Sequence, residues 1–175
     1  MKFNIYLRRL KDEISEYLLL EKWCRQKEIY QFFEQRILNF SEIHAKYYPR
    51  TKMDAVCPVY VIEYDKIPIG IIQYKKLTQV EQNEYNLCVD NAIEVDLFIG
   101  EENYRGKGIG EQSIKLFIEM IATVYPNYLI IMCPLIDNTP AIKCYGKCGF
   151  EIKQIVKLKD TIGNFQNYLL MIKQI

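Results

Sequence analysis

One stretch of the sequence, residues 96–110, constrains the fold more than any other. It reads Asp-Leu-Phe-Ile-Gly-Glu-Glu-Asn-Tyr-Arg-Gly-Lys-Gly-Ile-Gly and predicts a strand that runs through a glycine-rich loop into a helix. Glycines let backbone amides approach a ligand closely, and a helix N-terminus adds partial positive charge. Arg105 and Lys107 add full charges. The stretch predicts a site for a phosphorylated ligand, and the alternative is a flexible turn with two solvated basic residues.

Alternation and helical spacing predict the other elements. Strands are expected at residues 3–10, 59–64, 67–74, 92–99, 128–132, 151–158 and 166–172. Helices are expected at residues 13–27, from residue 40 to just before Pro49, at 109–124, and from Thr139 to the stop at Gly149. Ser41 and Thr139 are the expected N-caps, and residues 78–91 are expected to form a loop. Strands that alternate with helices late in the chain predict an α/β domain with a mixed sheet, and residues 1–175 fit a single domain.

Composition excludes several classes of protein. The chain has 23 Lys and Arg against 22 Asp and Glu, so it lacks the basic excess of a nucleic-acid binder. The longest uncharged stretch, residues 120–136, is too short for a membrane span and contains two prolines. Residues 1–11 do not form a targeting segment. Six scattered cysteines and one histidine predict reduced thiols, no metal site and a cytoplasmic location.

The glycine spacing fits neither the P-loop nor the dinucleotide-binding loop. It fits Arg/Gln-x-x-Gly-x-Gly/Ala, and residues 138–150 fit Asn-x-x-Ala-x-x-x-Tyr-x-x-x-Gly-Phe. Both motifs resemble those of the GNAT superfamily of N-acetyltransferases. The resemblance implies a mixed, mostly antiparallel central sheet of about six to seven strands flanked by about four helices. It also implies acetyl-CoA as the acetyl donor, with no metal.

A closer resemblance, over nearly the whole chain, is to the aminoglycoside 6′-N-acetyltransferases. It is carried by the blocks at residues 20–23, 61–64, 68–73, 96–100 and 107–110. The resemblance implies a small-molecule partner, with the 6′-amine of an aminoglycoside as the first acceptor, and a monomer or homodimer. Two alternatives stay open. One is another small amine, a polyamine or a peptide N-terminus as acceptor, and the other is a non-catalytic acyl-CoA-binding sensor.

Two positions depart from the pattern of the aminoglycoside enzymes. Cys133 stands where the family usually has aspartate, and Lys75 stands where it often has an aromatic residue. Both changes weaken a pocket for a polycation. Asp96 is retained, and Glu94 lies two residues earlier, so the two carboxylates are expected on the same face of one strand.

Acetyl transfer to an amine requires a neutral amine, so a base must accept its proton. Asp96 matches the carboxylate that the aminoglycoside enzymes use for this purpose, and Glu94 is the alternative. Tyr145 matches the family tyrosine that protonates the departing thiolate. Trp23 and Gln73, with both carboxylates, complete the expected substrate-binding set. Aromatic residues at helical spacing after Trp23, namely Tyr30, Phe32 and Phe33, form either an acceptor wall or core.

The resemblance also implies the residues that bind acetyl-CoA. Backbone amides around Leu97 and Phe98, where the fourth strand separates from the fifth, would bind the oxyanion of the reaction. The backbone through Ile99, with Asn138 and Ala141, would contact the pantetheine arm. The pyrophosphate would lie against the loop, formed by Arg105, Gly106, Lys107, Gly108, Ile109 and Gly110.

Overall fold

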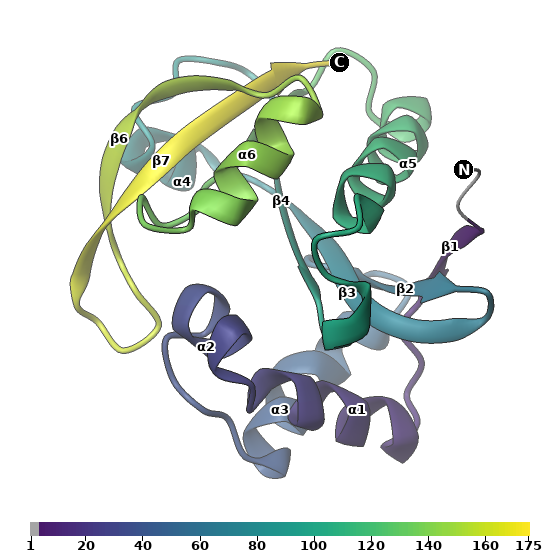
Figure 1. The fold of residues 1–175 in the computed structure, drawn as a ribbon. Helices are drawn as coiled ribbons and strands as arrows, with labels where there is room; N and C mark the ends of the chain where they lie inside the picture. Colours follow the sequence, from purple (N-terminus) through teal and green to yellow (C-terminus); the bar gives the residue numbers. More distant parts are fainter. Residues whose placement is uncertain (1–3) are drawn as a thin grey trace.

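The computed structural model describes residues 4–175, so Phe3, where the first strand is expected to begin, lies outside the described residues. Within that range one sheet has the strand order β1-β2-β3-β4-β5-β7-β6 (Figure 1). The strands are β1 (Ile5–Arg9), β2 (Val59–Tyr64), β3 (Ile67–Lys76), β4 (Ala92–Ile99), β5 (Leu129–Met132), β6 (Glu151–Lys159) and β7 (Phe165–Gln174). The helices are α1 (Ile14–Cys24), α2 (Lys27–Phe33), α3 (Phe40–Tyr47), α4 (Gln79–Glu84), α5 (Ile109–Val124) and α6 (Thr139–Lys147), with the 3₁₀ turns η1 (Tyr48–Thr51) and η2 (Glu102–Tyr104).

The sheet has helices on both faces, which confirms the expected α/β class. Helices α1 to α3 gather beside one face at the β1–β4 end, and α5 and α6 lie across the other face (Figure 1). Side chains alternate along β4, so Ile93 and Val95 pack with α5, whereas Phe98 packs with α1 and α2. The apolar stripe of α5 explains its placement, because Ile114 and Phe117 are fully buried against the sheet.

All neighbouring strands are antiparallel except β4 and β5, which are parallel. Their pairing covers only Ala92–Glu94 on β4 and ends at the Glu94–Ile131 pair. From Val95 onward β4 pairs only with β3. The second half of β4 therefore has one unpaired edge, which opens a cleft between β4 and β5, as the resemblance to the GNAT superfamily implied.

Two short helices were not predicted. The helix expected at residues 13–27 ends at Cys24, and α2 follows it from Lys27 to Phe33, because the chain bends at Gln26, where the backbone is extended. The Gln26 side chain donates a hydrogen bond to the Gly100 carbonyl at 3.0 Å and accepts one from Arg105. Contacts distant in sequence therefore stabilise the bend. Helix α4 lies within the expected loop at residues 78–91, and a capping box of Thr78 and Glu81 begins it.

Two expected N-caps were wrong by one or two residues. Asn39, not Ser41, caps α3, because its side chain accepts from the Glu42 amide at 3.0 Å in a capping box. Asn138, not Thr139, caps α6 by accepting from the Ala141 amide at 3.3 Å. Thr139 is the first helical residue instead.

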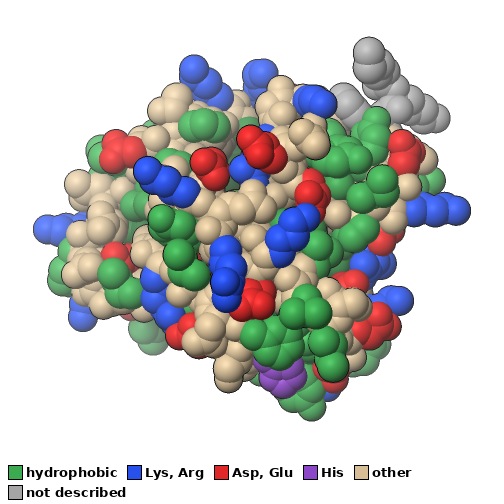
Figure 2. Space-filling model, turned by 60° about the horizontal axis from the view of Figure 1, so that its bottom comes forward, with side chains coloured by type: hydrophobic (Ala, Val, Ile, Leu, Met, Phe, Trp, Pro, Cys, Tyr) green, Lys and Arg blue, Asp and Glu red, His purple; other side chains and the backbone are tan. Residues whose placement is uncertain are grey.

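Charge is mixed over the surface. Figure 2 shows Lys and Arg side chains interspersed with Asp and Glu, in keeping with the formal net charge of +1. Among residues 4–175 no helix has both the length and the apolar character required to cross a bilayer. The six cysteines are free thiols.

Candidate active site

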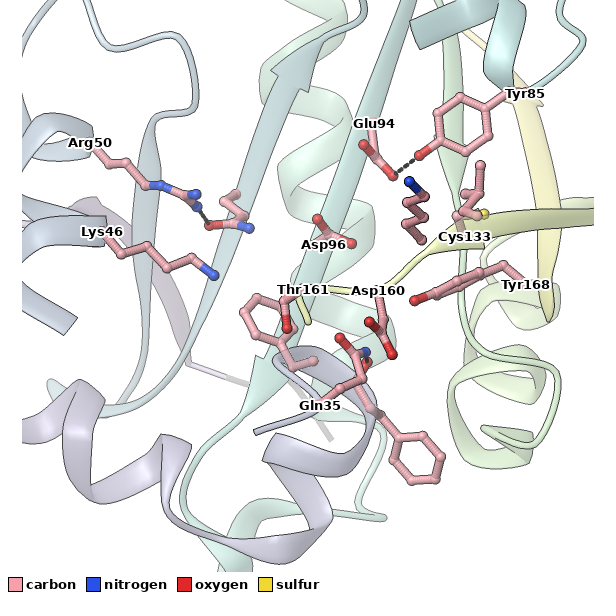
Figure 3. A pocket seen from close by; sticks show the side chains of 15 residues that line it. Gln35, Lys46, Arg50, Tyr85, Glu94, Asp96, Cys133, Asp160, Thr161 and Tyr168 are labelled. Carbon is pink, nitrogen blue, oxygen red and sulfur yellow. Dashed lines mark hydrogen bonds between the residues drawn. The ribbon is translucent and has the colours of Figure 1, made fainter. Parts of the chain in front are cut away.

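Two cavities meet beside the unpaired edge of β4. The larger, which we call the cofactor groove, has a volume of about 740 Å³. Its walls come from α2, the second half of β4, the loop before α5, and α6. The smaller, which we call the acceptor pocket, has a volume of about 290 Å³ (Figure 3). Four residues are shared by the walls of the two cavities: Phe32, Phe33, Asp96 and Cys133.

Strand β4 brings the two predicted carboxylates into the acceptor pocket. Glu94 and Asp96 both line it, as their spacing on one strand face predicted. Only Asp96 also lines the cofactor groove. Gln73 pairs with Asp96 in the β3–β4 register and lines the same pocket. The structure thus brings together three of the four expected substrate-binding residues.

The carboxylates are held in a partly buried environment. The Tyr85 hydroxyl, which follows α4, donates a hydrogen bond to Glu94 Oε1 at 2.6 Å. Burial, together with the negative charge of Asp96, raises the pKa of Glu94 to about 7. Burial also raises the pKa of Asp96 above its ordinary value. A base with a pKa near the working pH is the type that general base catalysis requires.

Tyr145 lies in the cofactor groove on α6, where the sequence places the proton donor. It is 8% exposed, and burial raises the pKa of its hydroxyl, which therefore stays protonated near neutral pH. Among residues 4–175 its hydroxyl makes no hydrogen bond. The group is therefore available to a ligand in the groove.

The backbone of β4 supplies polar groups to the cleft. Gly100 donates its N–H to the Ile69 carbonyl at 2.7 Å, so in an antiparallel ladder alternate residues of β4 direct their backbone groups toward β3. Phe98 is one of these, and its amide therefore faces β3 rather than the cleft. Leu97 and Ile99 face the unpaired side, where the Ile99 carbonyl accepts from Arg105 Nε at 2.8 Å. Leu97 thus has the amide that can reach a ligand.

The loop before α5 presents backbone to the groove. Gly106 and Gly108 line the groove with φ of 70° and 80°, a left-handed conformation that favours glycine. Gly108 is the N-cap of α5, so the free amides of the helix begin here. Gly110, two residues onward, also lines the groove. A loop of this kind at a helix N-terminus fits a pyrophosphate.

The remaining residues that were expected to bind the cofactor differ in whether they line the groove. Arg105 lines the groove, but its guanidinium donates to the Ile99 and Gly100 carbonyls and holds the loop against the end of β4. Lys107 is exposed and Ile109 is buried, and neither side chain lines the groove. Asn138 and Ala141 do line it, although the Asn138 oxygen is already bound as the cap of α6.

Trp23 is in the core and lines neither cavity. Its indole N–H donates to Glu101 at 2.8 Å, and its ring packs on Gly100, where a Cβ atom would approach to 2.2 Å. Phe32 and Phe33 form the aromatic wall instead. Lys75 does not line the acceptor pocket either, because it forms an ion pair with Glu81.

Several residues of the acceptor pocket were not predicted. Lys46 and Arg50 come from α3 and η1, and Asp160 and Tyr168 come from the β6–β7 hairpin (Figure 3). The Thr161 hydroxyl donates to the Glu34 carbonyl and joins that hairpin to α2. These segments meet only in the folded chain, and no local motif in the sequence indicates their contact.

Cys133 has no sign of an activated thiol. Burial, then the charges of Glu94 and Asp96, raise the pKa of its thiol. Within residues 4–175 no group of three or more His, Cys, Asp or Glu side chains is arranged to hold a metal ion.

Comparison with known proteins identifies the family. Residues 15–158 match the acetyltransferase (GNAT) domain, so the chain belongs to the GNAT acetyltransferase family.

Individual relatives are distant. An aminoglycoside N(6′)-acetyltransferase type 1 from Klebsiella pneumoniae is 21% identical over 145 residues, which are 81% of this chain and 72% of that protein. A spermine/spermidine N(1)-acetyltransferase from Bacillus subtilis (strain 168) is 26% identical over 88 residues, which are 50% of this chain. The match spans 55% of the length of that relative.

A solved structure agrees in fold over nearly the whole chain. The aminoglycoside acetyltransferase AAC(6′)-Ib in complex with coenzyme A has a TM-score of 0.75 at 18% identity, covering 98% of this chain and 95% of that chain. At this identity the likeness shows the fold, which confirms the predicted GNAT architecture.

Proposed function

We propose that this chain transfers the acetyl group of acetyl-CoA to a primary amine held in the acceptor pocket. The observation that carries the proposal is the position of Asp96, which lines both cavities at their junction. A group at that point reaches an amine on one side and a thioester on the other. The unpaired β4 edge and the glycine loop support the binding of acetyl-CoA in the groove.

Asp96 is the proposed base. Its carboxylate attracts an ammonium and then accepts the proton that the amine must lose before its lone pair can react. Glu94 is the second carboxylate of the pocket, and its pKa of about 7 lets it share that proton. The backbone amide of Leu97 donates to the carbonyl oxygen as negative charge develops there.

Tyr145 completes the proton balance. The amine nitrogen bonds to the acetyl carbon, the carbon–sulfur bond breaks, and the sulfur leaves with the electron pair. Tyr145 donates its hydroxyl proton to that sulfur, which leaves as the thiol of CoA, and the second proton that the nitrogen loses as the amide forms restores the Tyr145 hydroxyl. Its protonated hydroxyl in the groove, free of hydrogen bonds within residues 4–175, supports this role.

The aminoglycoside 6′-amine is the acceptor that the match to the Klebsiella pneumoniae relative supports. A polyamine is the alternative, because the Bacillus subtilis relative is a spermine/spermidine acetyltransferase. Both classes are polycations with primary amines. They share the reaction proposed here and differ only in what the rest of the acceptor pocket must accommodate.

Thiol release from acetyl-CoA, measured against a panel of primary amines, tests the proposal. Acetylation of at least one amine is expected, and Asp96→Asn is expected to abolish it while CoA binding, measured by calorimetry, stays within about twofold. The substitution keeps the size of the side chain and removes its charge and basicity. Glu119→Gln, an exposed position on α5, is the matched control.

The outcomes separate the rival functions. CoA binding with no acetylation of any amine would favour a non-catalytic acyl-CoA sensor. Normal turnover by Asp96→Asn together with inactive Glu94→Gln would move the role of base to Glu94.

A further inference from the structure

The acceptor pocket contains cations as well as carboxylates. Lys46, Arg50 and Lys159 line it together with Glu94, Asp96 and Asp160. A site that binds only a polycation would be expected to present carboxylates alone, because each cation in the wall repels an ammonium of the acceptor. The positive side chains therefore restrict the acceptor.

Arg50 and Lys159 are the cations of this wall that form no ion pair within residues 4–175. Lys46 forms an ion pair with buried Glu34, and the Lys159 ammonium lies 5.4 Å from the centre of the Phe165 ring. Arg50 lies close enough to Asp96 for its charge to lower the pKa of that carboxyl, but within residues 4–175 it forms no ion pair. Its Nη1 donates to Gln73 Oε1 at 2.7 Å, and its other guanidinium N–H groups make no hydrogen bond within the described range. A partly buried guanidinium with free donors is a ready site for an anion.

The orientation of Arg50 is fixed. Its guanidinium lies 5.4 Å from the centre of the Tyr47 ring, and Arg9 donates to its backbone carbonyl at 3.1 Å. Gln73, which accepts from Arg50, is opposite Asp96 in the strand register. Figure 3 shows Arg50 and Lys46 on one side of the pocket, with Asp96 and Glu94 across from them. Two cations of the pocket therefore lie across from the two carboxylates of β4.

We propose that the acceptor carries a carboxylate as well as its primary amine, and that Arg50 binds the carboxylate while Asp96 receives the amine. This inference rests on the proposed transfer to a primary amine, but it replaces the two polycationic acceptors named there with an amphoteric, amino-acid-like molecule. The planar fork of a guanidinium matches a carboxylate in two parallel hydrogen bonds. Each side of the pocket then meets an acceptor group of opposite charge.

The test compares acceptors that differ only in the carboxylate. Lysine and cadaverine share the same aliphatic amine, as do ornithine and putrescine, and the second member of each pair lacks the carboxylate. Acetylation of each is measured with acetyl-CoA, with kanamycin and spermidine as polycationic acceptors. The wild-type chain is expected to favour at least one amino acid over its diamine by about tenfold or more in kcat/KM.

Variants assign that preference to Arg50. Arg50→Gln is expected to reduce the ratio to within about threefold, and Arg50→Lys, which keeps the charge, to retain part of it. Loss of turnover alone does not support the inference, because Arg50 also contacts Gln73. The ratio between matched acceptors is the readout that a merely structural role leaves unchanged. Arg25→Gln, at the C-cap of α1, is the matched control, because its side chain is 59% exposed.

Three results would overturn the inference. The first is equal or better turnover of both diamines, the second is a preference unchanged in Arg50→Gln, and the third is kanamycin or spermidine as the best acceptor. In each of these the chain still acetylates an amine, so the proposed function survives. Absence of acetylation for every amine would reject the proposed function, and the inference with it.

Discussion

At the scale of single residues, the hydrogen bond from Tyr85 to Glu94 controls the charge of the acceptor pocket. The hydroxyl donates to Glu94 Oε1 at 2.6 Å and favours the ionised carboxylate, against the burial that raises its pKa to about 7. Tyr85→Phe removes the hydrogen bond that lowers the pKa of Glu94, whereas the burial that raises this pKa stays, so the pKa of Glu94 rises further. The acidic limb of the kcat/KM profile should then move upward by roughly one pH unit.

A pH–rate profile of both proteins measures this shift. The matched control is Tyr125→Phe, which removes a phenol hydroxyl outside both cavities. An acidic limb at the same pH in Tyr85→Phe and wild type would mean that Glu94 does not take part in proton transfer.

Tyr145 has a different role, which a conservative substitution isolates. Its hydroxyl is the proposed donor to the departing sulfur, whereas its ring packs in the core beside Phe150. Tyr145→Phe keeps the ring and should lower kcat by roughly 10²–10⁴-fold with little change in CoA affinity. Steady-state kinetics and calorimetry measure the two effects separately. A loss of less than about threefold would make Tyr145 a packing residue.

The sequence predicts some of these residues and not others, for a physical reason. Glu94 and Asp96 share a face because side chains alternate along a strand, so their proximity follows from spacing alone. Arg50 is 46 residues from Asp96 and reaches the pocket only through the packing of η1 beside β3. Its role has no local signal.

At the scale of elements, the loop into α5 depends on left-handed glycines. Gly108 has a φ of 80° and no side-chain neighbour within 4 Å of a built Cβ, so conformation rather than space requires glycine there. Gly108→Val should strain the loop by roughly 1–2 kcal/mol and place a side chain between the α5 amides and a pyrophosphate. The KM for acetyl-CoA should rise by about tenfold or more.

Titration with CoA and thermal unfolding of the same variant distinguish strain from ligand loss. Gly163→Val, in the β6–β7 turn with a φ of 90°, has comparable strain away from the cofactor groove and serves as control. Unchanged CoA affinity in Gly108→Val would reject the loop as the pyrophosphate site.

The two helices that were not predicted differ in whether the sequence contains a local signal for them. Helix α4 begins with Thr78 and Glu81 at capping-box spacing, a signal visible in the sequence. The bend between α1 and α2 has no such signal, because Gln26 is fixed by Gly100 and Arg105 at the far end of β4. Without that bend, Phe32 and Phe33 would not line the two cavities.

At the scale of the whole molecule, the order of motifs along the sequence predicts the fold better than it predicts the acceptor pocket. The motifs at residues 105–110 and 138–150 lie on consecutive elements around β5, so their spacing indicates the architecture and the cofactor groove. The acceptor pocket draws on α2, α3, β4 and the β6–β7 hairpin. Its charges depend on tertiary packing, and residues such as Lys46 and Asp160 enter it without a motif.

The acceptor carboxylates should also lower the stability of the entire fold. Glu94 has a pKa of about 7 when folded, against an ordinary value near 4.5 when unfolded, so the folded chain binds more protons between those pH values. Stability therefore falls as pH rises from about 4.5 to 7, and the penalty is fully present above pH 7. Glu94→Gln removes it and can still accept the Tyr85 hydrogen bond. The variant should be more stable than wild type by on the order of 1–3 kcal/mol at pH 8, and by little at pH 4.5.

Urea unfolding at both pH values measures the difference, with Glu119→Gln as an exposed carboxylate control. The same substitution should slow acetylation, because the carboxylate that destabilises the fold is the one that shares the amine proton. An equal stability change at both pH values would show that the gain comes from packing rather than from relief of a buried charge. A destabilised variant at pH 8 would mean that the Glu94 carboxylate is well compensated in the fold. Gain in stability with loss of turnover is therefore the joint outcome expected of an active-site carboxylate.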